Sequence, residues 1–259
     1  MKLVTFNIRI ESPMETQQVN NFIHRAGGIL EKIHQEAPDV ICFQEVTNLI
    51  RDFLRRHLTD YTMYGHGREA DCTGESCVVA VKNGMFELLN CDTFWLSDTP
   101  DVPGSKFPEG QSRFPRICTV VRLLRCCDKQ IFTIYNTHLD FFTDEVSLAG
   151  MKLVLQRVQE DRRKWDTPFF ITGDLNSMPD SPTITYANRF TNPAVADLTA
   201  SIPCTNHDFG LFHPKSAKID YIFTDEQTAK TVQDVYIWDD VNAGIYLSDH
   251  YPVCAVLDF

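Results

Sequence analysis

The chain begins with Met1-Lys-Leu-Val-Thr-Phe-Asn7, and a second short run, Val40-Ile-Cys-Phe-Gln-Glu45, is apolar until its last two residues. Polar and apolar residues alternate in the first run, which favours a β-strand, and the second run is typical of a short buried strand. Between them, apolar residues recur at helical spacing up to Pro38, which ends the predicted helix. Parallel strands joined by a helix bring their ends to the same edge of a sheet. We therefore expect Asn7 and Glu45 to lie close together.

The rest of the chain mixes further strands and helices. Residues 98–116 hold four Pro and two Gly and predict a long surface loop. Strands that follow one another without a helix between them should pair antiparallel. Helices are predicted at 49–58 and 145–165, and strands at 76–81, 85–95, 117–124, 130–137, 169–172, 219–224, 231–238 and 252–257. This order suits a single domain over residues 1–259, in which two packed sheets are covered by helices.

Composition and charge exclude several classes of protein. The hydrophobic share of 43% is ordinary for a globular domain, and there is no apolar run long enough to cross a membrane. The net charge of −11 argues against tight, non-specific binding of nucleic acid, which depends on clustered Lys and Arg. A local basic stretch at 106–129 keeps a nucleic-acid substrate open as an alternative. No obligate protein partner is evident.

Nine cysteines cannot all pair with one another. Cys42, Cys118 and Cys254 lie in apolar runs and are interpreted as core residues. No second CxxC or His pair completes a zinc site. We expect free thiols in a reducing compartment, with a Cys72–Cys77 disulfide as the alternative. The N-terminus has no cleavable signal segment, which predicts retention in the cytoplasm.

Polar side chains recur at the ends of apolar strands, where open α/β sheets build their sites. Carboxylate and amide oxygens without thiolates select Mg²⁺, Mn²⁺ or Ca²⁺ over Zn²⁺. Neighbouring carboxylates also need a cation to stay ionised together. Histidines can donate to phosphate oxygens or move protons, so the set suits metal-assisted attack of water on phosphorus. The residues are Asn7, Glu45, His138, Asp174, Asn176, Asp220, Asp249 and His250.

Each of these residues, taken singly, also has an ordinary structural interpretation. Asn7 can be a strand-end turn residue, Glu45 a solvated charge, and His138 a hydrogen-bonded core residue. Residues 173–182 can be a turn in which Ser181 and Pro182 begin a short helix, and Asp249 can be a helix cap. Their joint occurrence in this order favours the functional interpretation.

Six segments along the chain together resemble one known family, the endonuclease/exonuclease/phosphatase family. The resemblance spans residues 5–253 and implies an α/β (α+β) fold, a four-layer αββα sandwich of two mixed β-sheets flanked by helices. It also implies a Mg²⁺-dependent phosphoesterase, with Mn²⁺ as an alternative ion. The segments are Thr5-Phe-Asn7, Phe43-Gln-Glu45-Val46, Asn136-Thr-His138-Leu139, Gly173-Asp174-Leu-Asn176, Ile219-Asp220-Tyr-Ile222 and Ser248-Asp249-His250-Tyr-Pro-Val253.

The resemblance further implies a role for each matched residue. Glu45 would be the main metal ligand, with Asn7 and Asp249 nearby. Asp174 would position or deprotonate the attacking water, and Asn176 would hold a phosphate oxygen. His250, oriented by Asp220, would stabilise developing charge or activate water, and His138 would bind phosphate or assist the leaving group. Which group acts as the general base stays open.

The stretch from Phe94-Trp-Leu-Ser97 to Pro115-Arg116-Ile-Cys-Thr119 is similar to a mostly bacterial branch of this family. Lys106, Arg113 and Arg116 could meet a substrate phosphate, and Arg116 is the best placed because it stands at a strand start. The alternative is a Pro-rich loop with solvated charges. Trp95 is better explained as a core residue than as a stacking platform.

Two kinds of phosphate ester compete as substrate. A small soluble ester, such as a sugar phosphate or a nucleotide, needs only a pocket, whereas a nucleic acid needs a basic groove. The alternative function is a non-catalytic binding module that retains the fold. Such a module should lack a metal ligand or a base, and every expected position is filled here.

Overall fold

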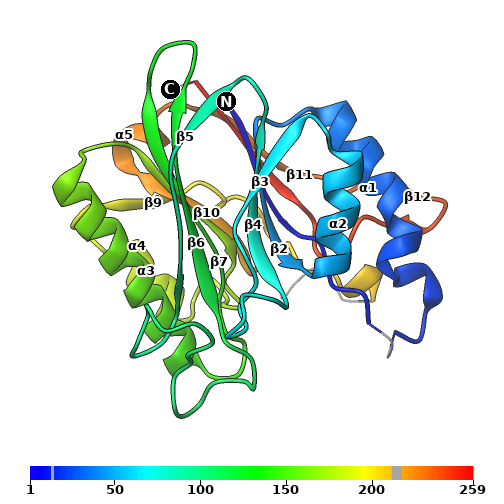
Figure 1. Ribbon diagram of the computed structural model, residues 1–259, viewed down its shortest axis with the longest axis horizontal. Coiled ribbons are helices and arrows are strands. Elements are labelled where there is room, and N and C mark those ends of the chain that lie inside the picture. The colour runs from blue at the N-terminus through cyan, green and yellow to red at the C-terminus, as the bar shows by residue number, and fades with distance from the viewer. Residues whose placement is uncertain (13–14, 212–217, 259) are drawn as a thin grey trace.

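A computed structural model describes residues 1–12, 15–211 and 218–258. Two six-stranded sheets pack against each other, and helices cover the outer face of each (Figure 1). The order of layers is helix, sheet, sheet, helix, so the predicted four-layer sandwich is confirmed. That residues 1–259 act as one domain stays a prediction.

The first sheet contains the two strands that open the chain. Its order is β11-β14-β1-β2-β4-β3, and β1 pairs parallel with β2, whereas the other pairs are antiparallel. In this register Asn7 lies opposite Gln44, next to Glu45, as the strand–helix–strand pattern predicts. The strands are β1 (Lys2–Asn7), β2 (Val40–Val46), β3 (Tyr61–Tyr64), β4 (Ser76–Lys82), β11 (Val232–Ile237) and β14 (Val253–Leu257).

The second sheet repeats this arrangement with the middle of the chain. Its order is β5-β6-β7-β8-β10-β9, and β7 pairs parallel with β8 so that His138 lies opposite Asp174. A hairpin of β12 (Val241–Asn242) and β13 (Ile245–Tyr246) stands apart from both sheets. The strands of the second sheet are β5 (Phe86–Trp95), β6 (Ile117–Arg125), β7 (Ile131–His138), β8 (Phe169–Asp174), β9 (Val195–Asp197) and β10 (Asp220–Asp225).

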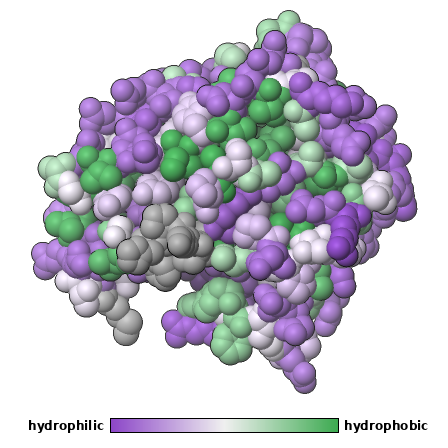
Figure 2. Space-filling model, turned by 180° about the vertical axis from the view of Figure 1, so that it is seen from behind, coloured by the Kyte–Doolittle hydropathy of each residue, from purple (hydrophilic) through white to green (hydrophobic). Residues whose placement is uncertain are grey.

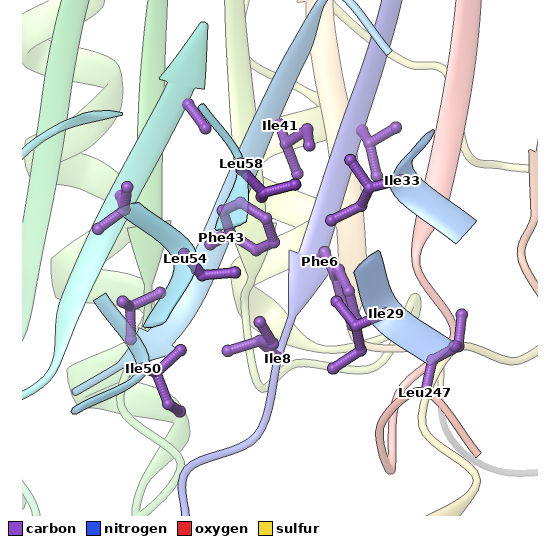
Figure 3. Packing of buried hydrophobic residues seen from close by; sticks show 14 of the residues in the cluster. Phe6, Ile8, Ile29, Ile33, Ile41, Phe43, Ile50, Leu54, Leu58 and Leu247 are labelled. Carbon is purple, nitrogen blue, oxygen red and sulfur yellow. The ribbon is translucent and has the colours of Figure 1, made fainter. Parts of the chain in front are cut away.

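Apolar side chains form one core between the sheets and another beneath each helical layer. Phe6, Phe43 and Ile29 belong to the core under the helices of the first sheet (Figure 3). Leu3, Val121 and Phe170 belong to the core between the sheets, and α3 packs on the second sheet. The helices are α1 (Phe22–Glu36), α2 (Asn48–His57), α3 (Asp144–Lys164), α4 (Pro182–Asn188) and α5 (Glu226–Ala229), with short 3₁₀ turns η1 (Gln18–Asn20) and η2 (Asp208–Gly210).

Local sequence explains where the helices begin and end. Thr143 accepts from the Val146 N–H and caps α3, which has acidic residues in its first turn and basic residues in its last. Ser181 caps α4 through the Ile184 N–H, as predicted from the Ser-Pro pair. The helices predicted at 49–58 and 145–165 are confirmed within one residue, and the helix predicted to end at Pro38 is α1 (Phe22–Glu36).

One predicted strand pairing is wrong. β4 and β5 follow each other without a helix, yet they belong to different sheets. β2 and β3 already occupy the two edges of β4, so the turn at 83–85 carries the chain across to the other sheet. The pairings of β5 with β6 and of β6 with β7 are antiparallel, as expected. The short strands β3, β9, β12 and β13 carry no clear alternation and are not predicted.

A polar network joins the two sheets beneath their shared edge. Gln44 Nε2 donates to Asn136 Oδ1 at 2.7 Å, and Asn136 Nδ2 donates to the carbonyls of Phe43 and Val78 at 2.9 and 3.0 Å. Both amides are fully buried. Buried polar groups persist when they are hydrogen-bonded, and their geometry then fixes how the surrounding strands meet.

The cysteines and the surface agree with the composition. All nine cysteines lie in described segments and are free thiols, so the alternative Cys72–Cys77 disulfide is not formed. Cys42, Cys118 and Cys254 are fully buried, as expected.

Polar side chains dominate the face in Figure 2, with apolar ones gathered in patches among them. In the part of the chain that is described, no helix combines the length and the apolarity needed to span a bilayer.

Candidate active site

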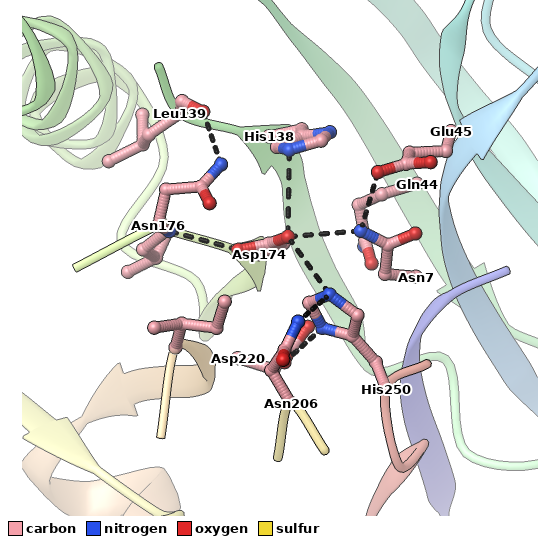
Figure 4. A network of polar contacts seen from close by, with 12 residues as sticks. Asn7, Gln44, Glu45, His138, Leu139, Asp174, Asn176, Asn206, Asp220 and His250 are labelled. Atoms are coloured by element: carbon pink, nitrogen blue, oxygen red, sulfur yellow. Dashed lines mark hydrogen bonds and ion pairs between the residues drawn. The ribbon is translucent and has the colours of Figure 1, made fainter. Parts of the chain in front are cut away.

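Asp174, the last residue of β8, is the centre of a polar cluster at the edge where both sheets end (Figure 4). Its Oδ2 accepts from Asn7 Nδ2 at 3.0 Å. The same oxygen lies 3.5 Å from His138 Nε2 and 3.8 Å from His250 Nε2. Its Oδ1 accepts from the backbone N–H of Asn176 at 2.9 Å. Residues that are far apart in the sequence thus converge on one carboxylate.

His250 forms a buried dyad with Asp220. His250 Nδ1 lies 2.8 Å from Asp220 Oδ2, and Nε2 lies 2.7 Å from Asn206 Nδ2. Burial alone would lower the pKa of His250, but Asp220 and then Asp174 outweigh it and raise the pKa well above its ordinary value. The ring is therefore held as an imidazolium. The Asn206 amide can then be turned over so that its oxygen accepts from Nε2–H, since its O and N occupy equivalent positions.

Burial also perturbs Asp174 itself. Desolvation, followed by the nearby charge of Asp220, raises the pKa of Asp174 to about 7. A carboxylate with a pKa near the working pH can take and return a proton efficiently. The pKa of Asp174 and the pKa of its neighbour His250 are therefore both raised, the first chiefly by burial and the second by nearby carboxylates.

His138 is the opposite case to His250. It is buried at the end of β7, and burial, followed by the charges of Arg116 and Arg68, lowers the pKa of His138 well below its ordinary value. The ring is therefore neutral around pH 7 and can offer one N–H as a hydrogen-bond donor. This sets it apart from an ordinary core histidine, because its ring faces the same oxygen of Asp174 as His250 does.

Glu45, Asn7 and Asp249 line the side of the cluster that belongs to the first sheet. Asn7 Nδ2 donates to Glu45 Oε1 at 3.1 Å as well as to Asp174, and the Ile10 N–H donates to Glu45 Oε2 at 2.9 Å. Glu45 has a φ of 59° at an irregularity in the pairing of β2 with β4. A non-glycine residue in the left-handed region is strained, and such strain is common at functional sites. It aims the carboxylate toward the cluster rather than into the strand.

The oxygen donors of this cluster fit a divalent cation. Glu45, Asp174 and Asp249 supply carboxylates without any thiolate, which is the donor set of a hard cation, and the Asn7 amide holds Glu45 and Asp174 together through Nδ2. In addition, Asp220 Oδ1 is buried and lacks a hydrogen-bond partner among the described residues. Such an acceptor is costly unless a cation or water satisfies it.

A tighter group is also present within the described segments. Ligand atoms of Asp174, Asp220 and His250 lie within 4.8 Å of one another. Both ring nitrogens of His250 are already hydrogen-bonded, to Asp220 and Asn206. This trio is therefore better suited to proton transfer, and the Glu45 side to holding a cation.

The cluster forms the floor of a cleft with a volume of about 330 Å³. Arg116 lines it and is 5% exposed, and its Nε donates to Asp140 Oδ2 at 3.2 Å. Asn176 also lines it, and its Nδ2 donates to the Leu139 carbonyl at 3.0 Å, which leaves its oxygen free of that bond. Lys106 and Arg113 do not line this cleft, and Arg113 instead stacks on Phe114 at 4.5 Å. Of the three basic residues considered, only Arg116 reaches the site.

Several residues of the cleft are not predicted from the sequence. Arg9 Nε lies 3.4 Å from Asp249 Oδ2. Arg68 is held by both carboxylate oxygens of Glu75, at 2.9 and 2.6 Å. Asn206 reaches His250 from a long loop, with no strand end to mark it. Arg9 follows β1 by two residues, so its place beside Asn7 is a signal that could have identified it.

Comparison with known proteins agrees with this geometry. The family model described as Endonuclease/Exonuclease/phosphatase family matches residues 4–250. The chain belongs to the endonuclease/exonuclease/phosphatase family. Members of this family are hydrolases that act on phosphoester bonds, so the predicted enzyme class is confirmed at that level. The family membership itself, predicted from the six segments, is confirmed as well.

Three relatives of this family member extend over nearly its whole length. The endonuclease/exonuclease/phosphatase structure from Bacteroides vulgatus is 28% identical, with a TM-score of 0.89 and coverage of 99% of this chain and 98% of that chain. The mannosyl-6-phosphatase from Bacteroides thetaiotaomicron is 22% identical and shares the fold, with a TM-score of 0.88 and full coverage of both chains. The mimivirus protein L388 is 22% identical over 271 residues, which is all of both chains.

Proposed function

We infer that this protein is a divalent-cation-dependent phosphoesterase that hydrolyses a small phosphate ester by in-line attack of water. The observation that carries this proposal is the meeting of Asp174, His250 and Glu45 at the floor of one cleft. We assign Mg²⁺ as the ion, with Mn²⁺ as a substitute, and Glu45 as its main ligand beside Asn7 and Asp249. When bound, the ion would neutralise phosphate charge and lower the pKa of bound water.

The proton-transfer roles follow from the perturbed groups. Asp174 positions the attacking water and takes its proton, because the pKa of Asp174 lies near neutrality. The oxygen of that water bonds to phosphorus, and the leaving oxygen departs with the electrons of the broken P–O bond and takes a proton from solvent. His250, kept protonated by Asp220, donates to the charge that develops on the phosphoryl oxygens.

The remaining residues hold the phosphate. His138 is neutral and donates one N–H to a phosphoryl oxygen, and Asn176 contacts a second one. Arg116 adds a guanidinium, which recognises phosphate oxygens through several N–H groups at once. The roles of His138 and Asn176 agree with those implied by the family pattern for the same residues.

A small ester is favoured over a nucleic acid because basic side chains near the middle of the chain lie beside acidic partners. The basic stretch from 106 to 129 does not form an open positive groove, because Arg122 lies 3.9 Å from Asp161 and Arg125 is paired with Asp128. The net charge of −11 points the same way. A mannosyl-6-phosphatase with this fold supports a compact substrate for this cleft. The free cysteines support the proposed cytoplasmic location.

Hydrolysis of bis-p-nitrophenyl phosphate tests the proposal. Activity should require Mg²⁺ or Mn²⁺ and be abolished by EDTA, and Glu45→Gln should lower kcat by at least about 10²-fold because the ion loses its main ligand. Glu31→Gln, on the exposed side of α1, is the matched control and should keep full activity. Equal activity of Glu45→Gln and Glu31→Gln, or activity that survives EDTA, would remove this proposal.

A further inference from the structure

Two adjacent phenylalanines after β7 are both exposed, yet only one faces the cleft. Phe141 is 61% exposed and lines the cleft, whereas Phe142 is 64% exposed and does not line it. An isolated exposed apolar side chain is common on protein surfaces. Phe141 differs because its ring lines a cleft whose other side chains, apart from Ile10 and Phe114, are polar or charged, and Phe114 is already stacked against Arg68 and Arg113.

The position of Phe141 is fixed by a buried carboxylate. Asp140 Oδ1 accepts from the Phe142 N–H at 3.0 Å and from the Ser112 N–H at 3.1 Å, and Oδ2 accepts from Arg116 Nε at 3.2 Å. Asp140 is 2% exposed. One side chain therefore anchors the backbone around Phe141, the 98–116 loop and the guanidinium of Arg116.

Arg116 and Phe141 form a continuous wall. The guanidinium carbon of Arg116 lies 5.7 Å from the centre of the Phe141 ring. Only Nε of Arg116 is hydrogen-bonded within the described segments, and its Nη atoms are not among the buried atoms that lack a partner. The Nη groups thus remain accessible to an anion in the cleft, beside the largely exposed side chain of Phe141.

We propose that Phe141 is a stacking platform for a planar aromatic ring of the substrate, so that the small ester is a nucleotide. This inference rests on the proposed phosphoesterase function and names its substrate class. A phosphate held by Arg116, His138 and Asn176 leaves the rest of the substrate to extend along the wall. There it meets a ring face, which suits a nucleobase and offers no hydrogen-bond group to a sugar hydroxyl.

Calorimetry with two matched ligands tests this assignment. AMP and ribose 5-phosphate share the phosphate and the sugar and differ by the adenine base. In EDTA, which stops hydrolysis of either ligand, the wild-type protein should bind AMP about tenfold more tightly, which is the order of magnitude for stacking one base on an aromatic side chain. Phe141→Ala should abolish this preference while leaving the affinity for ribose 5-phosphate unchanged. Phe142→Ala, the matched control, should keep the preference.

The outcomes separate this inference from the function on which it rests. Equal affinity of the wild-type protein for the two ligands, or no binding of AMP, overturns the nucleotide assignment. A loss of preference in Phe142→Ala as large as in Phe141→Ala overturns it as well. Metal-dependent hydrolysis of bis-p-nitrophenyl phosphate reports the proposed function independently, and its loss in Glu45→Gln would stand whichever ligand is preferred.

Discussion

The two sides of Asp174 differ in charge although each presents a buried histidine to the same oxygen. On one side His250 faces Asp220, which keeps the imidazole protonated. On the other side His138 faces Arg116 and Arg68, which keep it neutral. Burial penalises charge on both rings, so the difference comes from the neighbours. Identical side chains at equivalent distances are thereby given different tasks.

The largest expected effect comes from deleting each ring in turn. His250→Ala should lower kcat by about 10³-fold, because a preorganised charged donor to the transition state is lost. His138→Ala should lower kcat by about 10²-fold, because a neutral donor contributes less. Steady-state rates at saturating Mg²⁺ and substrate check this order. Losses of equal size would show that the two sides are not specialised.

Removing the charge of Asp220 should make both histidines neutral and should lower kcat less than deleting His250 does. Asp220→Asn keeps the shape but deletes the charge that raises the pKa of His250, so His250 should become neutral around pH 7. We expect kcat near neutrality to fall by about 10²-fold, within the usual range for general acid–base groups.

The pH profile provides the control for Asp220→Asn. Acid protonates Asp174 in both proteins, but in this variant it also restores the proton on His250. The activity of the variant relative to the wild type should therefore rise as the pH is lowered. A variant whose activity is low at every pH would instead indicate that Asp220 acts only on the geometry of the site.

The smallest expected effect is on how the free energy of unfolding varies with pH, measured by urea unfolding in EDTA. The pKa of His138 is lower in the folded state, so stability present above the unfolded pKa of about 6.5 is lost as pH falls below it. The pKa of His250 is raised, so its contribution is present below about 6.5 and is lost as pH rises through the folded value. Each slope is at most about 1.4 kcal/mol per pH unit.

Single substitutions should remove one slope each. His138→Gln should remove the loss of stability that His138 causes as pH falls, which leaves the opposite contribution of Asp174, whose pKa is raised to about 7. His250→Gln should flatten the alkaline side. A His138→Gln curve with an unchanged acid slope would assign that slope to other groups, such as His207, whose pKa burial lowers to about 4.

Sequence reasoning locates most of this site because the floor is built by strand ends. Asn7, His138 and Asp174 each end a strand, and parallel pairing places such ends at one edge. Periodicity in β1, α1 and β2 likewise predicts the first unit of the fold. Those signals are local, so they can be found without knowing how distant segments pack.

The parts that escape prediction depend on contacts with no local signal. Asn206 approaches His250 only because its loop forms an isolated bridge with that residue. Arg68 is held in the cleft by its ion pair with Glu75. Asp140 positions Arg116 and the 98–116 loop by accepting hydrogen bonds from both. The passage of the chain from β4 to the other sheet likewise depends on which edges earlier strands have filled.

The amides of Gln44 and Asn136 lie where the two sheets meet, just beneath a site to which each sheet contributes about half. Sliding one sheet past the other by a single residue would break these hydrogen bonds and leave buried amides unsatisfied. These buried hydrogen bonds therefore fix the spacing between Glu45 on one sheet and Asp174 on the other. Outer helices and surface loops can diverge between relatives without changing the distance over which the chemistry takes place.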